Sequence, residues 1–342
     1  MPIFMLDFFG VLLNVMGAVD LADLSFLFGP HLREEAGVLG QAELTVRLAA
    51  IEGVGSEVRV HGGDGRLLRR HAFHGLGGVP PLLPPFAVLG DRFGVLQAVV
   101  MAKGGVVVAL VGGVESPRSA LALALGVRGW GMVSGQRLVV DRCTGETLPF
   151  QVPLELRGAA LESAHASGLQ EQDLRTVTSP LTGSYLQVRP ESLLETVPVG
   201  ARLEPARIVR LCTAGGHRAS LEDWGRAPSV WPADAVGLLD GNPRMRLLLP
   251  PAGGVEEAAD LLDVRLCPPL GPPLGPPLGQ PIRQPIRQPL RKGTAPCPAD
   301  SPTTKERPAG STTPVSIRRE PRSSTALSST GSSAVRAGAG TT

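Results

Sequence analysis

Two kinds of hydrophobic pattern occur at the start of the chain. Residues 1–19 are apolar almost throughout, but Asp7 interrupts them early and no positively charged segment precedes them. They therefore differ from a targeting sequence, and we expect them to form core strands. Residues 44–48 and 57–61 alternate apolar and polar side chains, as half-buried strands do. The patterns together predict a small β-rich lobe over residues 1–90.

A continuous apolar run follows in the next part of the chain. Residues 106–111 are rich in β-branched side chains, which is typical of a strand buried on both faces. After a loop over residues 112–119, residues 120–127 contain mostly Ala and Leu and predict a buried helix. Gly129 is expected to end that helix in a left-handed turn. The pattern therefore predicts a strand, a loop and a helix in direct succession.

The loop partly matches a phosphate-binding sequence. That sequence is Gly, any four residues, Gly, Lys and then Ser or Thr, and Gly112, Pro117, Arg118 and Ser119 occupy its four fixed positions. Proline has no N–H to offer to a phosphate, and the planar guanidinium of Arg118 is wider than a lysine ammonium. Ser119 matches the sequence fully and is a weak candidate ligand for Mg²⁺. We therefore expect a phosphate loop whose framework is kept and whose chemistry is degraded.

Further loop residues complete the predicted cofactor site. A phosphate loop aims backbone N–H groups at an anion beside a helix N-terminus. Gly113 and Ser116 are the other loop positions expected to contribute, whereas Glu115 adds a negative charge where a polyanion would lie. ATP and Mg²⁺ are therefore expected as cofactors only if the loop is functional, and otherwise no cofactor is expected.

The segments around the loop also occur in a recognisable order. They are Arg92-Phe93-Gly94-Val95-Leu96-Gln97-Ala98, Lys103-Gly104-Gly105, Arg128-Gly129-Trp130-Gly131-Met132-Val133-Ser134-Gly135-Gln136 and Thr144-Gly145-Glu146-Thr147-Leu148-Pro149-Phe150. With these segments the chain resembles the catalytic domain of the HPr serine kinase family, particularly its shorter bacterial relatives, over about residues 80–267. The resemblance implies an α/β P-loop domain with a mixed sheet. Members of that family transfer the γ-phosphoryl group of ATP to a serine of a small protein or peptide.

The resemblance also indicates where catalytic groups are missing. Family members commonly have a histidine in the strand before the loop, where this chain has Gln97, and an acidic pair where it has Gly135 and Gln136. Phosphoryl transfer depends on Mg²⁺ and on a group that orients or deprotonates the attacking hydroxyl. The resemblance therefore implies a catalytically impaired or inactive relative that still binds a peptide or small-protein partner. It also leaves a homo-oligomer possible.

Two alternatives remain at the level of sequence. In the first, the chain is an active ATP-dependent serine kinase in which Arg118 and Ser119 hold phosphate and an unassigned acid holds Mg²⁺. Asp141 is the nearest acid, but it follows the apolar residues 138–140 and is expected to mark the end of a strand. In the second, the folded body is inert and the chain acts as an adaptor through its C-terminal tail.

The C-terminal part differs sharply in composition from the rest of the chain. Residues 268–291 repeat Pro-Pro-Leu-Gly, Gln-Pro-Ile-Arg and Gln-Pro-Leu-Arg, which favours extended polyproline II structure. Residues 292–342 are rich in Ser, Thr, Pro and Gly and are expected to be disordered. We therefore divide the chain into a front lobe (1–90), a degenerate P-loop domain (91–267) and a Pro-rich basic tail (268–342).

Charge and hydropathy exclude two classes of partner. Residues 268–342 hold ten Lys or Arg and three Asp or Glu, so their net charge is +7. Because the whole chain has a net charge of +2, residues 1–267 have a net charge of −5. A mildly acidic folded body argues against a dedicated nucleic-acid binder. No run of about 18 uninterrupted apolar residues is present, so no membrane span is expected.

Cysteines and histidines add no metal site to the predicted chemistry. The four cysteines are far apart and lack the paired spacing of a zinc site or a disulfide framework, so we expect reduced thiols and a cytoplasmic location. His61, His71 and His74 lie near one another in the sequence, but no Cys or acid accompanies them closely. They are predicted to be solvated residues on an exposed hairpin.

Overall fold

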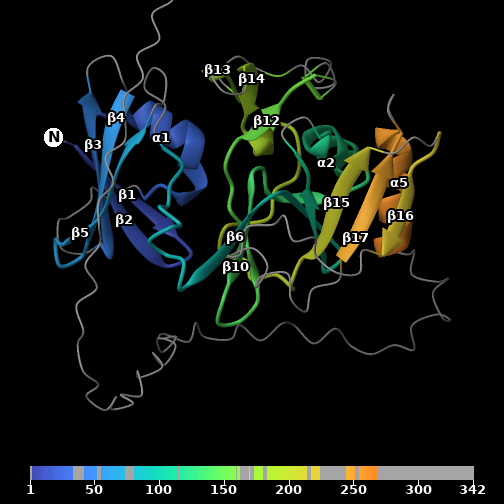
Figure 1. Ribbon diagram of the computed structural model, residues 1–342, viewed down its shortest axis with the longest axis horizontal. Coiled ribbons are helices and arrows are strands. Elements are labelled where there is room, and N and C mark those ends of the chain that lie inside the picture. Colours follow the sequence, from blue (N-terminus) through green and yellow to red (C-terminus); the bar gives the residue numbers. More distant parts are fainter. Residues whose placement is uncertain are drawn as a thin grey trace, which may run out of the picture. The chain divides into compact units, whose positions relative to one another are not determined.

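A computed structural model (Figure 1) describes most of the first 267 residues. The described ranges are 2–33, 42–51, 55–73, 81–113, 116–158, 160–161, 169, 173–179, 183–213, 217–223, 244–250 and 254–267. All of them belong to one compact unit, residues 1–285. The fold is mixed α/β, with several sheets and few helices. The predictions for the tail, for His74, for Glu115 and for the fourth cysteine, Cys297, lie outside the described residues.

The elements follow the chain in the order given by their labels. The strands are β1 (Ile3–Phe8), β2 (Val11–Gly17), β3 (Leu44–Ile51), β4 (Gly55–Gly62), β5 (Leu67–Phe73), β6 (Phe93–Gln97), β7 (Val99–Lys103), β8 (Val106–Val111), β9 (Gly131–Ser134), β10 (Arg137–Asp141), β11 (Thr147–Leu148), β12 (Leu154–Leu156), β13 (Leu174–Ser179), β14 (Gly183–Val188), β15 (Arg207–Thr213), β16 (Ser220–Asp223) and β17 (Arg244–Leu249). The helices are α1 (Leu21–Phe28), α2 (Arg118–Val127), α5 (Val255–Leu266) and the short 3₁₀ turns η1 (Gly29–His31) and η3 (Pro190–Ser192).

The first five strands form one sheet, which we call the front sheet. Its order is β1-β2-β3-β4-β5, with β2 and β3 parallel and the other neighbours antiparallel. The helix α1 begins after Asp20, whose side chain accepts a hydrogen bond from the Ala22 N–H at 2.8 Å. The predicted strands over residues 1–19, 44–48 and 57–61 are confirmed.

The hydrophobic core of the front sheet continues into residues beyond 90. Phe8 and Val15 belong to the same buried cluster as Phe93, Val139 and Phe150. The rings of Phe8 and Phe150 lie 5.9 Å apart between centroids. Because these side chains share one core, the residues on either side of position 90 are fixed against each other by packing.

A mixed six-stranded sheet, here called the central sheet, carries the predicted strand and helix. Its order is β16-β17-β15-β8-β7-β9, and β8 is parallel to β15 and antiparallel to β7. Within β8, Val108 and Leu110 enter one buried cluster, whereas Val107 and Ala109 enter another. Both faces of β8 are therefore covered, and the prediction from its continuous apolar run is confirmed.

The helix α2 follows β8 and packs against α5 and the central sheet. It begins at Arg118, two residues before the expected start, because Pro117 takes the N-cap position and proline is well tolerated where a helix begins. Leu121 and Leu125 are fully buried. Gly129 has a φ of 79°, so the left-handed turn expected after this helix is confirmed.

A hydrogen-bonded carboxylate fixes α5 to the central sheet. One oxygen of Asp263 lies 2.7 Å from the Lys103 ammonium and accepts a hydrogen bond from the Trp130 indole N–H at 2.7 Å. Burial alone would raise the pKa of Asp263, but the hydrogen bonds from Lys103 and Trp130 outweigh it and lower that pKa below its ordinary value. We call Lys103, Trp130 and Asp263 the helix anchor.

Two small sheets complete the described fold. In the order β11-β10-β6, Arg137 on β10 lies directly opposite Gln97 on β6. The other small sheet has the order β12-β14-β13, so β12 pairs with β14, the middle strand of the three. An ion pair of 2.6 Å between Arg175 on β13 and Asp23 on α1 joins the second small sheet to the front lobe.

Two expectations about the whole chain can be compared with the described residues. Among the helices described, none combines the length and apolar character needed to cross a membrane. Cys212 and Cys267 carry free thiols, as expected. Cys143 is disulfide-bonded, so the expectation of reduced thiols throughout is wrong at this position.

Candidate functional site

The loop between β8 and α2 uses its own backbone donors internally. The Ser116 N–H and the Ser116 hydroxyl both donate to the Gly113 carbonyl, at 3.1 Å and 2.7 Å. The Arg118 N–H donates to the Ser116 carbonyl at 2.8 Å, and Pro117 has no N–H. Residues 116–118 therefore present no free backbone donor to an anion.

Packing in the loop requires a glycine at position 112 but not at position 113. A Cβ atom at Gly112 would lie 2.4 Å from the Ser116 hydroxyl oxygen, so no larger residue fits there without moving Ser116. Gly113 is exposed, with open space where its Cβ would be. Neither glycine lines the cavity beside the loop. Of the predicted cofactor residues, Ser116, Arg118 and Ser119 do line it.

That cavity, which we call the loop pocket, has a volume of about 390 Å³ and lies beside the start of α2. Residues that are far apart in the sequence meet on its walls. Six of the eight site residues predicted from the sequence are among them: Gln97, Ser116, Arg118, Ser119, Gly135 and Gln136. The volume lies within the range of roughly 300–1,000 Å³ that small-molecule sites occupy. The structure thus places most of the sequence-derived positions around one cavity.

The loop pocket also contains an acid that the sequence interpretation missed. Glu155 lies on β12 between the fully buried Leu154 and Leu156, and its side chain lines the loop pocket. Burial raises the pKa of Glu155 above its ordinary value, although the nearby Arg157, Arg118 and Arg137 act in the opposite direction. The alternation Leu-Glu-Leu-Arg over residues 154–157 was the available signal for a strand with a charged face.

Three arginines surround this single acid. Burial lowers the pKa of Arg118 and of Arg137, while the charge of Glu155 raises both. The Arg157 guanidinium lies 4.5 Å from the centre of the Tyr185 ring, and burial raises the pKa of the Tyr185 hydroxyl. Because three cations face one carboxylate, the loop pocket carries an excess of positive charge.

Ser119 and Glu155 are the oxygen donors that could hold a cation here. The Ser119 hydroxyl donates to the main-chain carbonyl of Glu155 at 2.5 Å, which ties the first turn of α2 to β12. No group of three His, Cys, Asp or Glu suited to a metal occurs among the described residues. Mg²⁺ is typically bound by one or two carboxylates together with phosphate oxygens. These two residues therefore fit Mg²⁺ only in the company of a phosphate-bearing ligand.

The positions expected for an acidic pair instead support the backbone. A Cβ atom at Gly135 would lie 3.0 Å from the Val152 carbonyl oxygen and 3.2 Å from the Leu154 Cα. The Gln136 side-chain amide donates to the Pro153 carbonyl at 3.0 Å. Gly135 thus leaves room for the segment that leads into β12, Gln136 is hydrogen-bonded to that segment, and neither supplies a carboxylate.

The two remaining candidates, Gln97 and Asp141, do not supply a catalytic base to the loop pocket either. Gln97 is exposed at the end of β6, and its neutral amide cannot take up a proton near neutral pH. Asp141 accepts a hydrogen bond from the Cys143 N–H at 2.9 Å and pairs with Arg202 at 3.2 Å. It ends β10 as predicted and does not line the loop pocket.

Comparison with known proteins gives little further information. No family model matches the chain, and no curated protein matches it. Among solved structures, the chain is similar to one described as the HPr(Ser) kinase/phosphatase from Coxiella burnetii, with 14% identity and a TM-score of 0.27. The matched region covers 50% of this chain and 95% of that chain. A similarity at this level assigns neither a fold family nor an activity.

Proposed function

We propose that the chain is an HPr-kinase-like P-loop protein with impaired catalysis, which binds a peptide or small-protein partner and keeps the loop pocket as a phosphate site. The observation that carries the proposal is the composition of the loop pocket. Arg118, Arg137 and Arg157 are gathered beside the start of α2, while the positions expected for a base and an acidic pair carry neither.

Phosphate binding is supported by charge and by helix geometry. The first-turn N–H groups of α2 at Ser119 and Ala120 have no acceptor within the helix, and the helix dipole favours an anion at this end. Arginine guanidinium groups bind phosphate oxygens through paired hydrogen bonds. These features compensate in part for the loop donors that are bonded internally or absent.

Impaired transfer follows from the lack of a free base. Transfer of a γ-phosphoryl group requires a group that takes or orients the proton of the attacking hydroxyl, together with Mg²⁺. Gln97 and Gln136 are neutral amides, and Gly135 leaves no room for an acid without a backbone shift. Within the part of the chain that the structure describes, Glu155 is the one acid that lines the loop pocket, and it has to serve the metal if Mg²⁺ enters with a nucleotide.

Calorimetric titration of the full chain with ATP and Mg²⁺ tests the proposal. We expect weak nucleotide binding without phosphoryl transfer, and a loss of about tenfold in affinity in Arg118→Ala. The double variant Pro117→Gly with Arg118→Lys is expected to bind more tightly, because it restores an N–H and an ammonium. Arg66→Ala, in an exposed turn of the front sheet, is the matched control and is expected to bind as the native chain does.

Two outcomes would contradict the proposal. If neither the native chain nor the double variant binds nucleotide while both keep native circular dichroism spectra, the loop pocket is not a phosphate site. If the native chain transfers phosphate to a serine peptide at a rate typical of kinases, catalysis is not impaired.

A second candidate function is an active ATP-dependent serine kinase. The observation that favours it is the position of Glu155 beside Ser119 in one cavity, since a carboxylate and a hydroxyl are suitable ligands for Mg²⁺. Release of labelled phosphate from ATP in the presence of Mg²⁺ distinguishes the candidates. Turnover that Glu155→Gln abolishes supports the active kinase, whereas an absence of turnover supports the impaired relative.

A further inference from the structure

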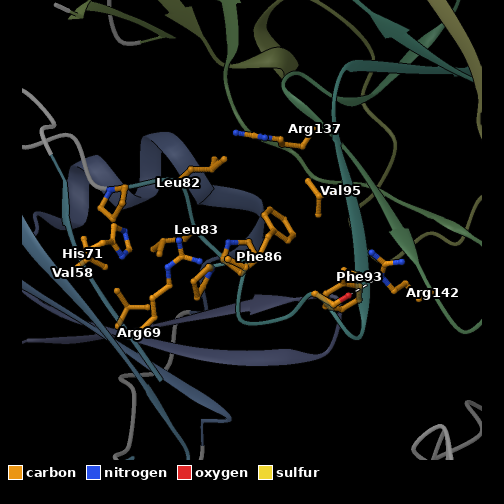
Figure 2. Close-up of a pocket in the computed structure, with 16 residues that line it drawn as sticks. Val58, Arg69, His71, Leu82, Leu83, Phe86, Phe93, Val95, Arg137 and Arg142 are labelled. Atoms are coloured by element: carbon orange, nitrogen blue, oxygen red, sulfur yellow. Dashed lines mark hydrogen bonds between the residues drawn. The ribbon is translucent and has the colours of Figure 1, made fainter. Parts of the chain in front are cut away.

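A second cavity, which we call the lobe pocket, lies between the front sheet and the strands that follow it. Its volume is about 650 Å³, again within the range of roughly 300–1,000 Å³ typical of ligand sites. Figure 2 shows Val58, Arg69 and His71 of the front sheet facing Leu83 and Phe86 across it. The lobe pocket shares Arg137 with the loop pocket, but it has none of the other loop-pocket residues.

The front sheet turns two polar side chains toward its apolar face at this point. In the register of β4 and β5, His71 lies opposite Val58 and Arg69 lies opposite Val60. Directly opposed residues share one face of a sheet, and both valines are buried in the core. Arg69 and His71 therefore extend over the core side of the edge strand β5.

His71 supplies an unsatisfied donor or acceptor. Its Nδ1 atom is buried and has no hydrogen-bond partner among the described residues. The sequence-based expectation of a solvated histidine is therefore wrong at His71, because residues 81–90 cover the face of β5 on which it lies. A buried polar atom without a partner costs free energy, which a hydrogen bond to a ligand would offset.

The charge in the lobe pocket has one sign. Arg69, Arg137 and Arg142 line it, and among the described residues no Asp or Glu does. Arg142 donates to the Gly90 carbonyl at 2.7 Å, whereas no ion pair of Arg69 occurs within the described part of the chain. In Figure 2 the Arg69 guanidinium extends toward Leu83 and Phe86. An exposed cation and apolar side chains thus line the same cavity.

We propose that the lobe pocket binds an apolar carboxylate. Its apolar part would lie on Leu83 and Phe86, and its carboxylate would accept hydrogen bonds from Arg69 and from His71. A guanidinium and a carboxylate form strong, charge-assisted hydrogen bonds, and the apolar wall favours a ligand with a hydrocarbon part. The proposal goes beyond nucleotide binding, because Arg118, Ser119 and Glu155 do not line the lobe pocket.

The test uses the full chain and the fluorescent apolar anion 8-anilinonaphthalene-1-sulfonate as the probe. We expect saturable binding at one site, weakened about tenfold in Arg69→Leu through loss of the charge-assisted hydrogen bonds. Arg70→Leu is the matched control, since Arg70 is the next residue on β5, faces the other way and pairs with Glu57 at 2.6 Å. This control is expected to bind the probe as the native chain does.

A second variant tests the cavity itself without removing a charge. Ala87 is exposed on the wall of the lobe pocket, so Ala87→Trp is expected to fill the cavity while leaving the unfolding temperature unchanged. Probe binding should then be lost. Arg118→Ala should leave probe binding unchanged, so a failure of phosphate binding in the loop pocket and a failure of this proposal give different results.

Competition separates the two sources of such a carboxylate. Octanoate, with octanol as its neutral analogue, represents a free acid, and acetyl-Leu-Phe-Asp-amide, with the Asn peptide as its analogue, represents a peptide segment. Displacement of the probe by either acid, with the neutral analogue about tenfold weaker, supports the proposal and identifies the source. Equal displacement by acid and neutral analogue, or equal probe binding by the native chain, Arg69→Leu and Ala87→Trp, overturns it.

Discussion

Asp263 and Glu155 are both partly buried carboxylates near cations, yet they are satisfied very differently. Asp263 accepts hydrogen bonds from Lys103 and Trp130 on a single oxygen, and its pKa is lowered. Glu155 faces several arginines, but no ion pair joins it to Arg118 within the described residues, and its pKa is raised. A paired carboxylate of the first kind holds the structure together, whereas one of the second kind leaves charge available to a ligand.

The largest predicted effect is a loss of folding stability at acid pH that is due to His31. It must be known before the pH dependence of the two acids is compared. His31 is buried against Phe8 and Phe150, and burial lowers its pKa from 6.5 to about 4. The unfolded chain therefore takes up this proton first as the pH falls below 6.5. The stability contributed by neutral His31 is full above pH 6.5 and is lost as the pH falls toward 4, by about 3 kcal/mol.

Urea unfolding at pH 7 and at pH 4.5 measures this effect. The native chain is expected to lose more stability between the two values than His31→Asn, which does not titrate. Equal losses in the two proteins would show that His31 is not protonated preferentially in the unfolded chain.

The second effect tests the helix anchor. Asp263→Asn removes the negative charge that Lys103 and Trp130 share, and we expect a loss of roughly 1–3 kcal/mol in unfolding free energy. Asp260→Asn on the same helix is the control, since Asp260 is largely exposed and its ion pair with Arg128 is expected to be worth less than about 1 kcal/mol. Chemical denaturation near pH 7 measures both, and equal effects would mean that the anchor acts as an ordinary surface ion pair.

The third prediction concerns the missing acidic pair. Gly135→Asp places a side chain 3.0 Å from the Val152 carbonyl oxygen, so we expect a loss of roughly 1 kcal/mol from overpacking. Gly113→Asp is the control, because a Cβ atom there meets open space. Thermal unfolding compares the two variants. An unchanged midpoint in Gly135→Asp would show that the segment before β12 yields easily and that an acid can be accommodated.

The smallest predicted effect has the opposite sign. Because the pKa of Glu155 is raised, its charged form disfavours the folded state, and this cost appears as the pH rises above the ordinary carboxyl range. Glu155→Gln is therefore expected to raise the unfolding midpoint near pH 7 by about 2 °C. Glu204→Gln, at an exposed position, should leave it unchanged. A lower midpoint in Glu155→Gln would show that attraction to the arginines outweighs burial and would remove the contrast with Asp263.

Patterns of local sequence predicted the elements but not their surroundings. The bounds of β8 follow from its unbroken apolar run, whereas the earlier start of α2 depends on Pro117 at the N-cap. Ser116, Arg118 and Ser119 came from the phosphate-loop pattern, whereas Gln97, Gly135 and Gln136 came from a family resemblance. A resemblance carries information on long-range contacts that local periodicity lacks. Glu155 was missed because its place in the loop pocket depends on how β12 pairs with β14 and approaches α2.

His71, on the wall of the lobe pocket, shows the same limit of local patterns. Alternation along β5 separates its two faces, but it does not say which face the connection over residues 81–90 covers. Only that long-range packing distinguishes the half-buried His71 from the exposed Arg70 beside it.

The position of Arg137 on the walls of both cavities has a thermodynamic consequence. One guanidinium has a fixed set of N–H donors. A ligand that binds some of them in one cavity therefore changes which donors remain for a ligand in the other cavity. If both cavities bind ligands as proposed, their occupancies are linked through this single side chain. By reciprocity, the factor by which the first ligand changes the affinity for the second equals the factor by which the second changes the affinity for the first.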